Sequence, residues 1–425
     1  MHETWIRTAT GPEGKLYLDL GDEDWQAVEI DKDGWRIISD PPVKFRRSGG
    51  GLPLPLPVQG DPEAGISLLG DLIRPQQPEH LKLLIGSLVS YLRPGYPFVG
   101  LQFDARPGSA KTSSQRVVES LIDPQAAETP GPPSNEGDLN TAAQGQWLVR
   151  FDNVSSITAG MSDAYCRLLT GGGSVKRKLY KNEERHSISV KRPLCMTLIK
   201  VRLRSDLAER SIVIPLAKIG EADRLPEEEL NRRLAEARPI ILGALLTGAS
   251  TALRRLEQTK RRYIGRLPRM ADFALFAEAA GEAFGWKDGE FIDGYRATIR
   301  TRRVDDAEDD DFCMTLFDWL CDLEGCQAEG KAGVLREAAF THASFNNVPN
   351  WFPPSPNAFA GAITRNEEML EAIGVEHDEF PDPHSQTAGR VHRLSLNEQG
   401  MLRRAERRQE LDRMGLRRWG GEEGR

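Results

Sequence analysis

The sequence predicts an α/β fold, in which a central α/β region follows a small β module and precedes a series of further helices. Three observations predict it. Apolar strands alternate with amphipathic helices over residues 61–225, which is the pattern of an α/β sheet. The first of those strands leads directly into a loop and a helix, the context that a phosphate-binding loop requires. Short strands fill residues 15–47, and after residue 226 apolar residues recur at helical spacing.

The composition is that of a globular protein with several domains. The chain has 425 residues, is 39% hydrophobic and 28% charged, and carries a net charge of −7. Because that charge gives no overall attraction to nucleic acid, DNA binding requires a local basic surface. No apolar run approaches the ~20 residues that cross a bilayer, and the N-terminus lacks a signal-peptide core. We therefore expect a cytoplasmic protein without a membrane partner. The five cysteines form no C-x-x-C pair, which favours structural thiols over a zinc site.

The first part of the chain contains a β module, a linker and the start of the α/β region. Residues 15–47 hold three short strands separated by GDED and DKDG, which are turn compositions. The Gly- and Pro-rich stretch SGGGLPLPLPVQG then predicts a linker. The spacing of apolar residues after it predicts helices over 61–74 and 79–93, a strand over 96–103 and a helix over 111–121.

Further strands and helices follow a proline-rich excursion at 124–137. The apolar runs WLVRF, RPLCMTLIKV and SIVIPL are expected strands at intervals that suit an α/β sheet, and the acidic run DDAEDDD marks a boundary at 305–311. Helical spacing is found over 226–237, 239–258, 268–284, 288–300, 312–324, 331–341 and 356–373, and strands are expected near 375–378 and 389–396.

The stretch FDARPGSAKT carries an altered phosphate-binding loop. The motif G-x-x-x-x-G-K-[ST] holds phosphates through backbone N–H groups and the positive end of the following helix, while its lysine neutralises charge and its hydroxyl ligates Mg²⁺. Lys111 and Thr112 occupy these last two positions, and alanines replace both glycines. We therefore expect ATP and Mg²⁺ as cofactors, bound by Ala105, Gly108, Ser109, Ala110, Lys111 and Thr112.

The strand WLVRF is followed by Asp152, roughly 40 residues beyond the loop. An apolar strand that ends in an acid is the arrangement of a Walker-B element, whose carboxylate holds magnesium. Asp152 is equally well explained as the cap of the next helix. Asn153 follows it, at the position where hydrolytic ATPases usually carry glutamate. An amide there can align a water molecule but cannot accept its proton.

Several stretches, in a fixed order, carry a family resemblance. They are GSAKT, WLVRFDNVSSI, SDAYCRLLTGGG and RPLCMTLIKVRLRSDLAERSIVIPL, followed by ARPIILGALL and RLPRMADFALFAEAAGEAFGW. Together they resemble the ATP-binding proteins of phages and integrated mobile elements, which are related to the AAA+ superfamily 3 helicases and often found with primases. The resemblance covers most of residues 15–300. It implies a P-loop NTPase core of AAA+ type with a helical lid, and a homo-oligomer.

Position by position, the resemblance makes Lys111 and Thr112 the phosphate and magnesium residues. Asp152 becomes the Walker-B acid and a metal ligand together with Thr112. Thr197 stands where the family usually has a sensor asparagine, and Arg210 matches an arginine that acts in trans or as a sensor in an oligomeric ring. Such an arginine contributes strongly to phosphoryl transfer. The catalytic set is therefore Asp152, Asn153, Thr197 and Arg210.

Alternatives and departures accompany this assignment. Arg210 is also explained as a surface arginine paired with Glu209 or Asp206. The family loop typically reads G-E-Q-G-S-A-K-[ST], so the alanine at 110 is usual for the family, whereas Ala105 is a departure from it. These differences favour nucleotide binding over fast hydrolysis.

The glycine-rich stretch TGGGSVKRKLYKNEERHSISV, residues 170–190, predicts a hairpin with Lys176, Arg177 and Lys178. In helicases of the kind that the chain resembles, such a hairpin projects into the pore of a ring and contacts nucleic-acid phosphates. The alternative is a solvated edge hairpin whose lysines prevent aggregation.

The C-terminal region resembles a winged-helix domain of the same family. The stretch WFPPSPNAFAGAITRNEEMLEAIG provides its last helix, capped by Ser355, and AGRVHRLSL provides the wing. Asn357, Arg365 and Arg393 are the candidate DNA contacts. Three glutamates of the same helix repel phosphate, so a protein-binding winged helix is the alternative.

The predicted organisation is an α/β P-loop NTPase with flanking modules. Its parts are a small β module (1–50), the ATPase core (61–225), a helical lid-like region (226–304), a winged-helix domain (312–396) and a charged tail (397–425). We expect a DNA-associated, helicase-like ATPase that serves replication of a mobile element. Its expected partners are single-stranded or forked DNA, further copies of itself, and a primase or another protein of the mobile element. The alternative is a non-catalytic regulator or assembly protein that binds nucleotide poorly.

Overall fold

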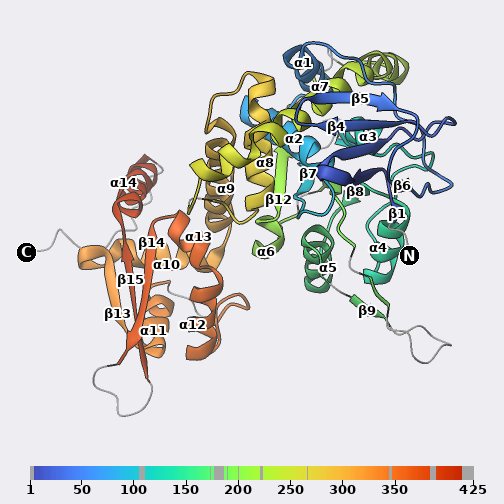
Figure 1. Ribbon diagram of the computed structural model, residues 1–425. Helices are drawn as coiled ribbons and strands as arrows, with labels where there is room; N and C mark the ends of the chain where they lie inside the picture. Colours follow the sequence, from blue (N-terminus) through green and yellow to red (C-terminus); the bar gives the residue numbers. More distant parts are fainter. Residues whose placement is uncertain are drawn as a thin grey trace, which may run out of the picture. The chain divides into compact units, whose positions relative to one another are not determined.

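The computed structural model describes residues 4–104, 111–172, 174–176, 186–188, 190–199, 201–220, 224–265, 267–343, 347–382 and 389–413 (Figure 1). The chain forms two compact units, Met1–Arg296 and Ala297–Arg425, and each has a hydrophobic core of its own. The boundary between the units falls inside a continuous helix, α9 (Glu290–Glu308).

A four-stranded parallel sheet lies at the centre of the first unit. Across the sheet the order is β12 (Ser211–Pro215), β7 (Gly100–Asp104), β11 (Leu194–Leu198) and β8 (Val149–Val154). Leu194 is in register with Gly100 on one side and with Val149 on the other. Because all pairs are parallel, the carboxyl ends of the strands meet at one edge of the sheet. The predicted α/β class with a parallel sheet is confirmed.

Apolar burial explains why these short runs become strands. Most strand residues are buried, as in a parallel sheet covered on both faces. The helices α2 (Pro78–Tyr91), α3 (Lys111–Ile122) and α5 (Ala159–Thr170) pack against it. The helix α4 (Glu136–Gly145) begins at the end of the proline-rich excursion at 124–137. The sequence did not predict it, because its residues EGDLNTAAQG have little apolar periodicity.

The N-terminal β module forms an antiparallel sheet, as expected. Its strands are β2 (Thr8–Thr10), β3 (Leu16–Asp19), β4 (Ala27–Asp31) and β5 (Gly34–Ile38), and a short parallel pair joins β1 (Thr4–Trp5) to β6 (Lys44–Phe45). A buried ion pair ties this module to the core: Arg7 Nε lies 3.0 Å from Asp123 Oδ1. Asp123 Oδ2 accepts from the backbone N–H groups of Trp147 and Leu148, just before β8.

The Gly- and Pro-rich stretch after the β module is held in place at several points. We call residues 51–58 the strap. Its backbone N–H groups donate from Leu52 to Pro124 O, from Leu54 to Leu20 O and from Val58 to Pro239 O. The strap therefore connects the β module, the excursion and a long helix, which a freely mobile linker would not do.

That helix, α7 (Glu227–Arg262), is continuous for 36 residues, whereas the sequence predicted two helices separated at Pro239. Proline removes a backbone donor and crowds the preceding turn, so a break is the local expectation. Packing against α1 (Pro62–Ile73) and α8 (Ala271–Ala280) offsets that cost. Even α7 lacks the apolar length to cross a membrane, and the same holds for every helix in the described ranges.

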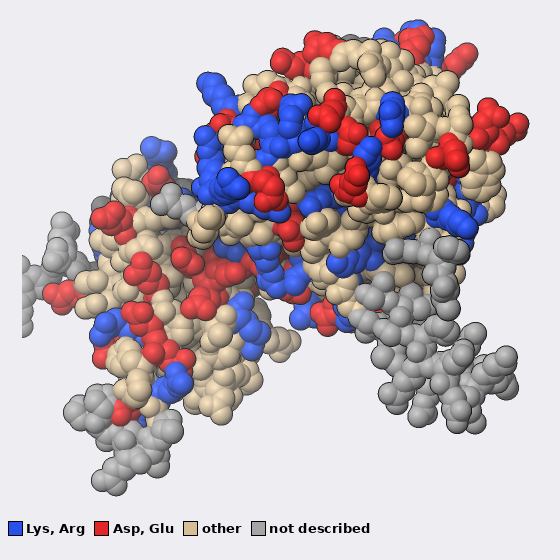
Figure 2. All heavy atoms as spheres, viewed as in Figure 1, with Lys and Arg blue, Asp and Glu red and all other residues tan. Residues whose placement is uncertain are grey.

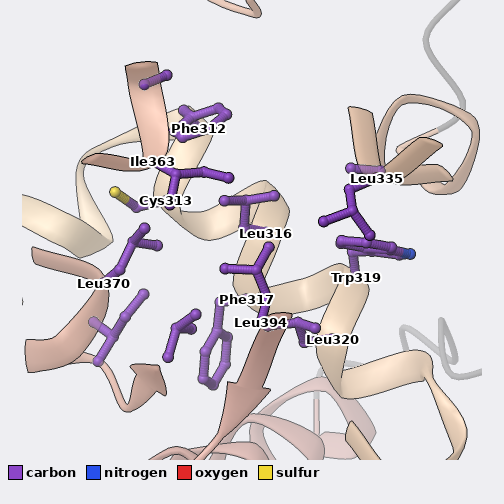
Figure 3. Packing of buried hydrophobic residues seen from close by; sticks show 14 of the residues in the cluster. Phe312, Cys313, Leu316, Phe317, Trp319, Leu320, Leu335, Ile363, Leu370 and Leu394 are labelled. Carbon is purple, nitrogen blue, oxygen red and sulfur yellow. The ribbon is translucent and has the colours of Figure 1, made fainter. Parts of the chain in front are cut away.

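The second unit combines helices with a three-stranded antiparallel sheet. Along the chain it contains α10 (Asp311–Asp322), β13 (Gln327–Gly330), α11 (Ala332–His342), α12 (Pro356–Arg365), α13 (Glu367–Ala372), β14 (Val375–Pro381), β15 (Arg390–Leu396) and α14 (Glu398–Arg413). The sheet order is β13-β15-β14. Side chains such as Phe312, Leu316 and Leu394 meet in its core (Figure 3). The predicted helix over 356–373 is divided at Asn366.

Candidate functional site at the carboxyl edge of the sheet

The candidate site lies where β7, β11 and β8 end and where α3 begins. β7 ends at Asp104, and α3 starts at Lys111. Four residues of the predicted loop, Ala105, Gly108, Ser109 and Ala110, lie between them and outside the described residues. The site is therefore built from α3 and the two neighbouring strands.

Lys111 and Thr112 lie beside both of these strands. Lys111 Nζ donates to the carbonyl oxygen of Leu198, the last residue of β11, at 2.9 Å. Thr112 Oγ1 donates to Asp152 Oδ2 of β8 at 3.1 Å. Thr112 of the loop motif is thus in contact with Asp152 of a separate strand, while Lys111 contacts the strand between β7 and β8.

The carboxylate of Asp152 is fixed from two further sides. The Thr197 hydroxyl donates to Oδ1 of Asp152, and the same hydroxyl accepts the backbone N–H of Asn153 at 2.8 Å. Asn153 adopts φ +56°, a left-handed conformation that asparagine tolerates better than most residues. Its backbone N–H also donates to Asp152 Oδ1 at 3.0 Å. Asp152, Asn153 and Thr197 therefore form one hydrogen-bonded group.

Gln115 is a residue of this region that the sequence reasoning missed. It is buried on α3, one turn beyond Lys111, and its Nε2 donates to Phe151 O at 3.1 Å and to Cys195 O at 3.0 Å. It thereby links α3 to both β8 and β11. A polar residue on the buried face of a helix was the available signal, because buried amides need partners.

A second missed feature is a buried ion pair below the site. Arg150 of β8 pairs with Glu119 of α3, and the side chain of Arg150 is 1% exposed. Burial raises the pKa of Glu119 above its ordinary value, although the positive charge of Arg150 opposes the shift. This pair joins the same two elements that Thr112 and Asp152 join.

The arrangement offers hard oxygen ligands beside a positive charge. A carboxylate and a hydroxyl are the ligand types that Mg²⁺ takes, usually with waters and substrate phosphates completing the octahedron. The described residues contain no group of three or more His, Cys, Asp or Glu side chains placed to hold a metal alone. The donor set at Thr112 and Asp152 therefore fits a magnesium ion shared with phosphate better than a metal held wholly by protein.

Arg210 lies at the amino end of β12, opposite the carboxyl edge of the sheet. β12 starts at Ser211, in register with Gly100, and α6 (Ser205–Ala208) precedes it (Figure 1). Arg210 Nη1 donates to the carbonyl oxygen and to Oδ1 of Asp206. The structure thus shows the pairing with Asp206 and does not bring Arg210 to the Asp152 side of its own sheet.

The described part of the stretch 170–190 forms the two strands of the predicted hairpin. β9 (Ser174–Lys176) pairs antiparallel with β10 (His186–Ile188). The backbone of Lys176 ends β9, whereas Arg177 and Lys178 lie outside the described residues.

The predicted contacts of the second unit lie on α12 and β15. Asn357 and Arg365 are exposed on α12. Arg393 of β15 pairs with Glu329 at 2.8 Å and lies over the ring of Phe380. Basic and acidic side chains alternate over the visible face of the protein (Figure 2). Of the three candidate DNA contacts, Arg393 therefore has its charge neutralised by Glu329 of the same unit.

Comparison with known proteins places this architecture in context. Residues 66–310, more than half of the chain, match a family described as "Actinomycete integrative conjugative element replication protein". The apo structure of the NrS-1 C-terminal region is 12% identical, with 89% of this chain and 96% of that chain covered and a TM-score of 0.39. The X-ray structure of JCV Helicase is 17% identical, with coverage of 53% and 65% and a TM-score of 0.26. No curated protein matches the chain.

Proposed function

This chain belongs to the family of actinomycete integrative conjugative element replication proteins, and on that premise we propose that it is a magnesium-dependent, DNA-associated ATPase. The observation that carries the proposal is the convergence of Lys111, Thr112, Asp152 and Thr197 at the carboxyl edge of the parallel sheet. Ligands of open α/β sheets bind at that edge, and the first turn of a helix such as α3 favours a phosphate group.

The side chains divide the work of phosphoryl transfer among them. The ammonium of Lys111 neutralises charge on the terminal phosphates, and the Thr112 hydroxyl and Asp152 carboxylate hold the magnesium ion. When bound, Mg²⁺ neutralises charge that develops on the phosphate oxygens. Thr197 keeps the Asp152 carboxylate oriented, and the amide of Asn153 aligns the attacking water. Asn153 stands at the position where a glutamate would take the proton and cannot accept it, so we expect slow turnover.

Arg210 acts, in this proposal, on a neighbouring copy of the chain. It lies about one strand length, ~13 Å, from the carboxyl edge of its own sheet, so its own nucleotide is out of reach. An arginine supplied in trans stabilises transition-state charge in other NTPases. The functional form is therefore a homo-oligomer in which Arg210 of one copy faces the ATP of the next.

DNA contacts are assigned to the hairpin of β9 and β10 and to the second unit. From α10 to β15 the order is helix, strand, three helices and two strands. With α12 and α13 taken as one helix divided at Asn366, this order supports a winged helix. Asn357 and Arg365, which are exposed on α12, are its other candidate contacts with DNA. Helices α7 to α9 correspond to the helical lid of the ATPase.

Substitution of Lys111 tests the catalytic proposal. Lys111→Ala should reduce DNA-stimulated release of phosphate from Mg-ATP by a factor of about 10²–10³, because the transition state loses a charge-assisted contact. Arg116→Ala, on the same helix with its side chain 42% exposed and paired with Glu227, is the matched control. Unchanged turnover in Lys111→Ala, with Arg116→Ala equally active, would remove the proposal.

A second candidate is a nucleotide-binding protein that does not hydrolyse ATP. The specific observation in its favour is Asn153, which replaces a general base beside Asp152. This candidate predicts Mg-ATP binding that depends on Lys111, with no phosphate release above background, and DNA or partner binding that persists in Lys111→Ala. Equilibrium binding of a fluorescent ATP analogue, run beside the phosphate assay, separates the two candidates.

A further inference from the structure

A four-residue ionic group surrounds Arg210 at the amino edge of the sheet. Asp206 Oδ1 accepts from Arg210 Nη1 and also from Arg269 Nη2, the latter at 2.6 Å. Arg269 Nη1 donates to Glu209 Oε2. Two arginines and two carboxylates therefore share one network, and Arg269 contacts both carboxylates.

Arg269 comes from a different part of the fold. It lies in the turn between α7 and α8, whereas Asp206 belongs to α6, directly before Arg210. α7 also contacts α3, because the guanidinium of Arg238 donates twice to Ser120 O, at 2.8 and 3.2 Å. The helix that precedes this turn is thus in contact, near its N-terminal end, with the helix that begins with Lys111.

Burial and charge distinguish the members of the group. The side chain of Glu209 is 7% exposed and that of Arg210 is 16% exposed, while Arg269 and Asp206 are about half exposed. Burial alone would raise the pKa of Asp206, but the hydrogen bond from Arg210 and the positive charge of Arg269 bring it below its ordinary value. Asp206 is therefore ionised at neutral pH, and the largely buried Glu209 is paired with Arg269.

Arg210 still has donors that Asp206 does not use. Both of its hydrogen bonds come from Nη1, and Nε is buried without a hydrogen-bond partner among the described residues. A guanidinium carries five N–H donors, so an approaching phosphate would find several of them available. The attraction of the two carboxylates for Arg210 opposes movement of its guanidinium from Asp206 to the phosphate.

We propose that Arg269 is the positioning residue for Arg210: by pairing with Asp206 and Glu209 it neutralises both carboxylates and leaves Arg210 able to contact the phosphates of ATP on a neighbouring copy. This inference rests on the proposed function. Without Arg269 the remaining group carries a net negative charge, which holds Arg210 back and repels phosphate. With Arg269 present, the four-residue group is neutral while Arg210 is paired with Asp206. When Arg210 moves away to contact the phosphates, Asp206 still has Arg269 as a partner.

Mixed oligomers test the proposal. One copy, the donor, carries Lys111→Ala and keeps Arg210; the other, the acceptor, carries Arg210→Ala and keeps Lys111. Each alone should be inactive, and their mixture should regain phosphate release because the donor's arginine serves the acceptor's ATP. Adding Arg269→Ala to the donor should lower the activity of the mixture about tenfold, whereas adding it to the acceptor should leave that activity unchanged.

Three further variants separate charge from folding. Arg269→Lys in the donor keeps a positive charge and should restore most of the activity. Glu209→Gln together with Arg269→Ala restores neutrality and should recover part of it. Arg254→Ala, half-exposed on α7 and paired with Glu282 at 3.0 Å, is the control and should have no effect in either copy.

The outcomes distinguish the inference from the function on which it rests. Equal losses with Arg269→Ala in donor and acceptor would show a structural role only and overturn the inference. An inactive donor–acceptor mixture beside an active wild type would overturn the trans role of Arg210. An inactive wild type would overturn the ATPase itself.

Discussion

At the residue scale, a single hydroxyl holds the carboxylate on which the proposed metal site depends. Thr197 is fully buried, donates to Asp152 Oδ1 and accepts the N–H of Asn153. Valine has nearly the same shape and no hydroxyl. Thr197→Val would therefore remove two partly buried hydrogen bonds, each of which contributes about 0.5–1.5 kcal/mol.

We accordingly expect Thr197→Val to lower the free energy of unfolding by about 1–3 kcal/mol in urea denaturation. Mg-dependent phosphate release should fall more steeply than ATP binding, because the metal ligand loses its orientation. Thr197→Ser keeps the hydroxyl and serves as the control. A valine variant that matches the serine variant in both measurements would contradict this reading of the site.

How much of the site could be predicted depends on where each residue's partner lies. Thr112 and Asp152 each belong to a local pattern, a strand followed by a loop or by an acid, so their contact follows from the order of strands in a parallel sheet. Gln115 has no such pattern, since its partners are two carbonyl groups on distant strands. The same holds for Arg269, whose role depends on a contact with α6 that no spacing in the sequence reveals.

At the element scale, the strap depends on close approach to α7. A Cβ built on Gly243 would lie 1.9 Å from the carbonyl oxygen of Val58, so only glycine fits between the strap and the helix. Gly160 is also helical, in α5, and a Cβ there would meet nothing within 4 Å. Gly160 lies in the first turn of α5 and Gly243 in the interior of α7, so the pair compares a helical glycine in open space with one in close contact.

Gly243→Ala should destabilise the protein by about 1–3 kcal/mol, since the clash involves backbone and must displace the strap. Gly160→Ala should be neutral or stabilising by up to about 1 kcal/mol, because alanine favours helix. Chemical denaturation of both variants measures the difference. Similar stabilities would show that the strap moves away from α7 without loss.

Local propensity predicted the elements whose own residues determine them and failed where distant packing decides. The strands of the parallel sheet were expected because each is a buried apolar run. α7 continues through Pro239 because the packing of α1 and α8 against the helix offsets the local cost of the proline. β13 was missed because QAEG has no strand pattern and forms only by pairing with β15.

The hairpin of β14 and β15 carries a pair of histidines with a predictable response to acid. His377 Nε2 lies 3.0 Å from His392 Nδ1, and the rings stack. Burial lowers the pKa of His392, and the charge of a protonated His377 lowers it further. The folded hairpin therefore binds a proton less readily than the unfolded chain. Its stability is complete above the unfolded pKa of about 6.5 and falls as the pH drops through the folded pKa.

Amide hydrogen exchange tests this response. Exchange over β14 and β15 should speed up between pH 7.5 and 5.5, after correction for the intrinsic pH dependence of exchange, and the change should be smaller in His392→Gln. Carboxylates whose pKa is at or below its ordinary value titrate below this window, so they do not produce the effect. A pH response that is identical in wild type and variant would rule out the histidine pair as its source.

At the scale of the whole molecule, two units with separate cores should unfold as two cooperative transitions. The described residues of the proposed nucleotide site, such as Lys111 and Asp152, lie within the first unit, and the histidine pair lies within the second. A ligand that binds only the folded state raises the stability of the unit that binds it. Nucleotide should therefore act on the first unit's transition alone, whereas acid acts on both, because burial also lowers the pKa of His80 in the first unit.

Calorimetry of the full chain measures this separation. A slowly hydrolysed ATP analogue with Mg²⁺, at about a hundred times its Kd, should add about 2.7 kcal/mol to the first unit and raise its Tm by several degrees. The other transition should stay in place. Lowering the pH from 7.5 to 5.5 should shift the second unit's transition downward, and Lys111→Ala should abolish the nucleotide shift without altering the acid shift. If nucleotide moved both transitions equally, the units would be energetically coupled through α9, and the division of function between them would fail.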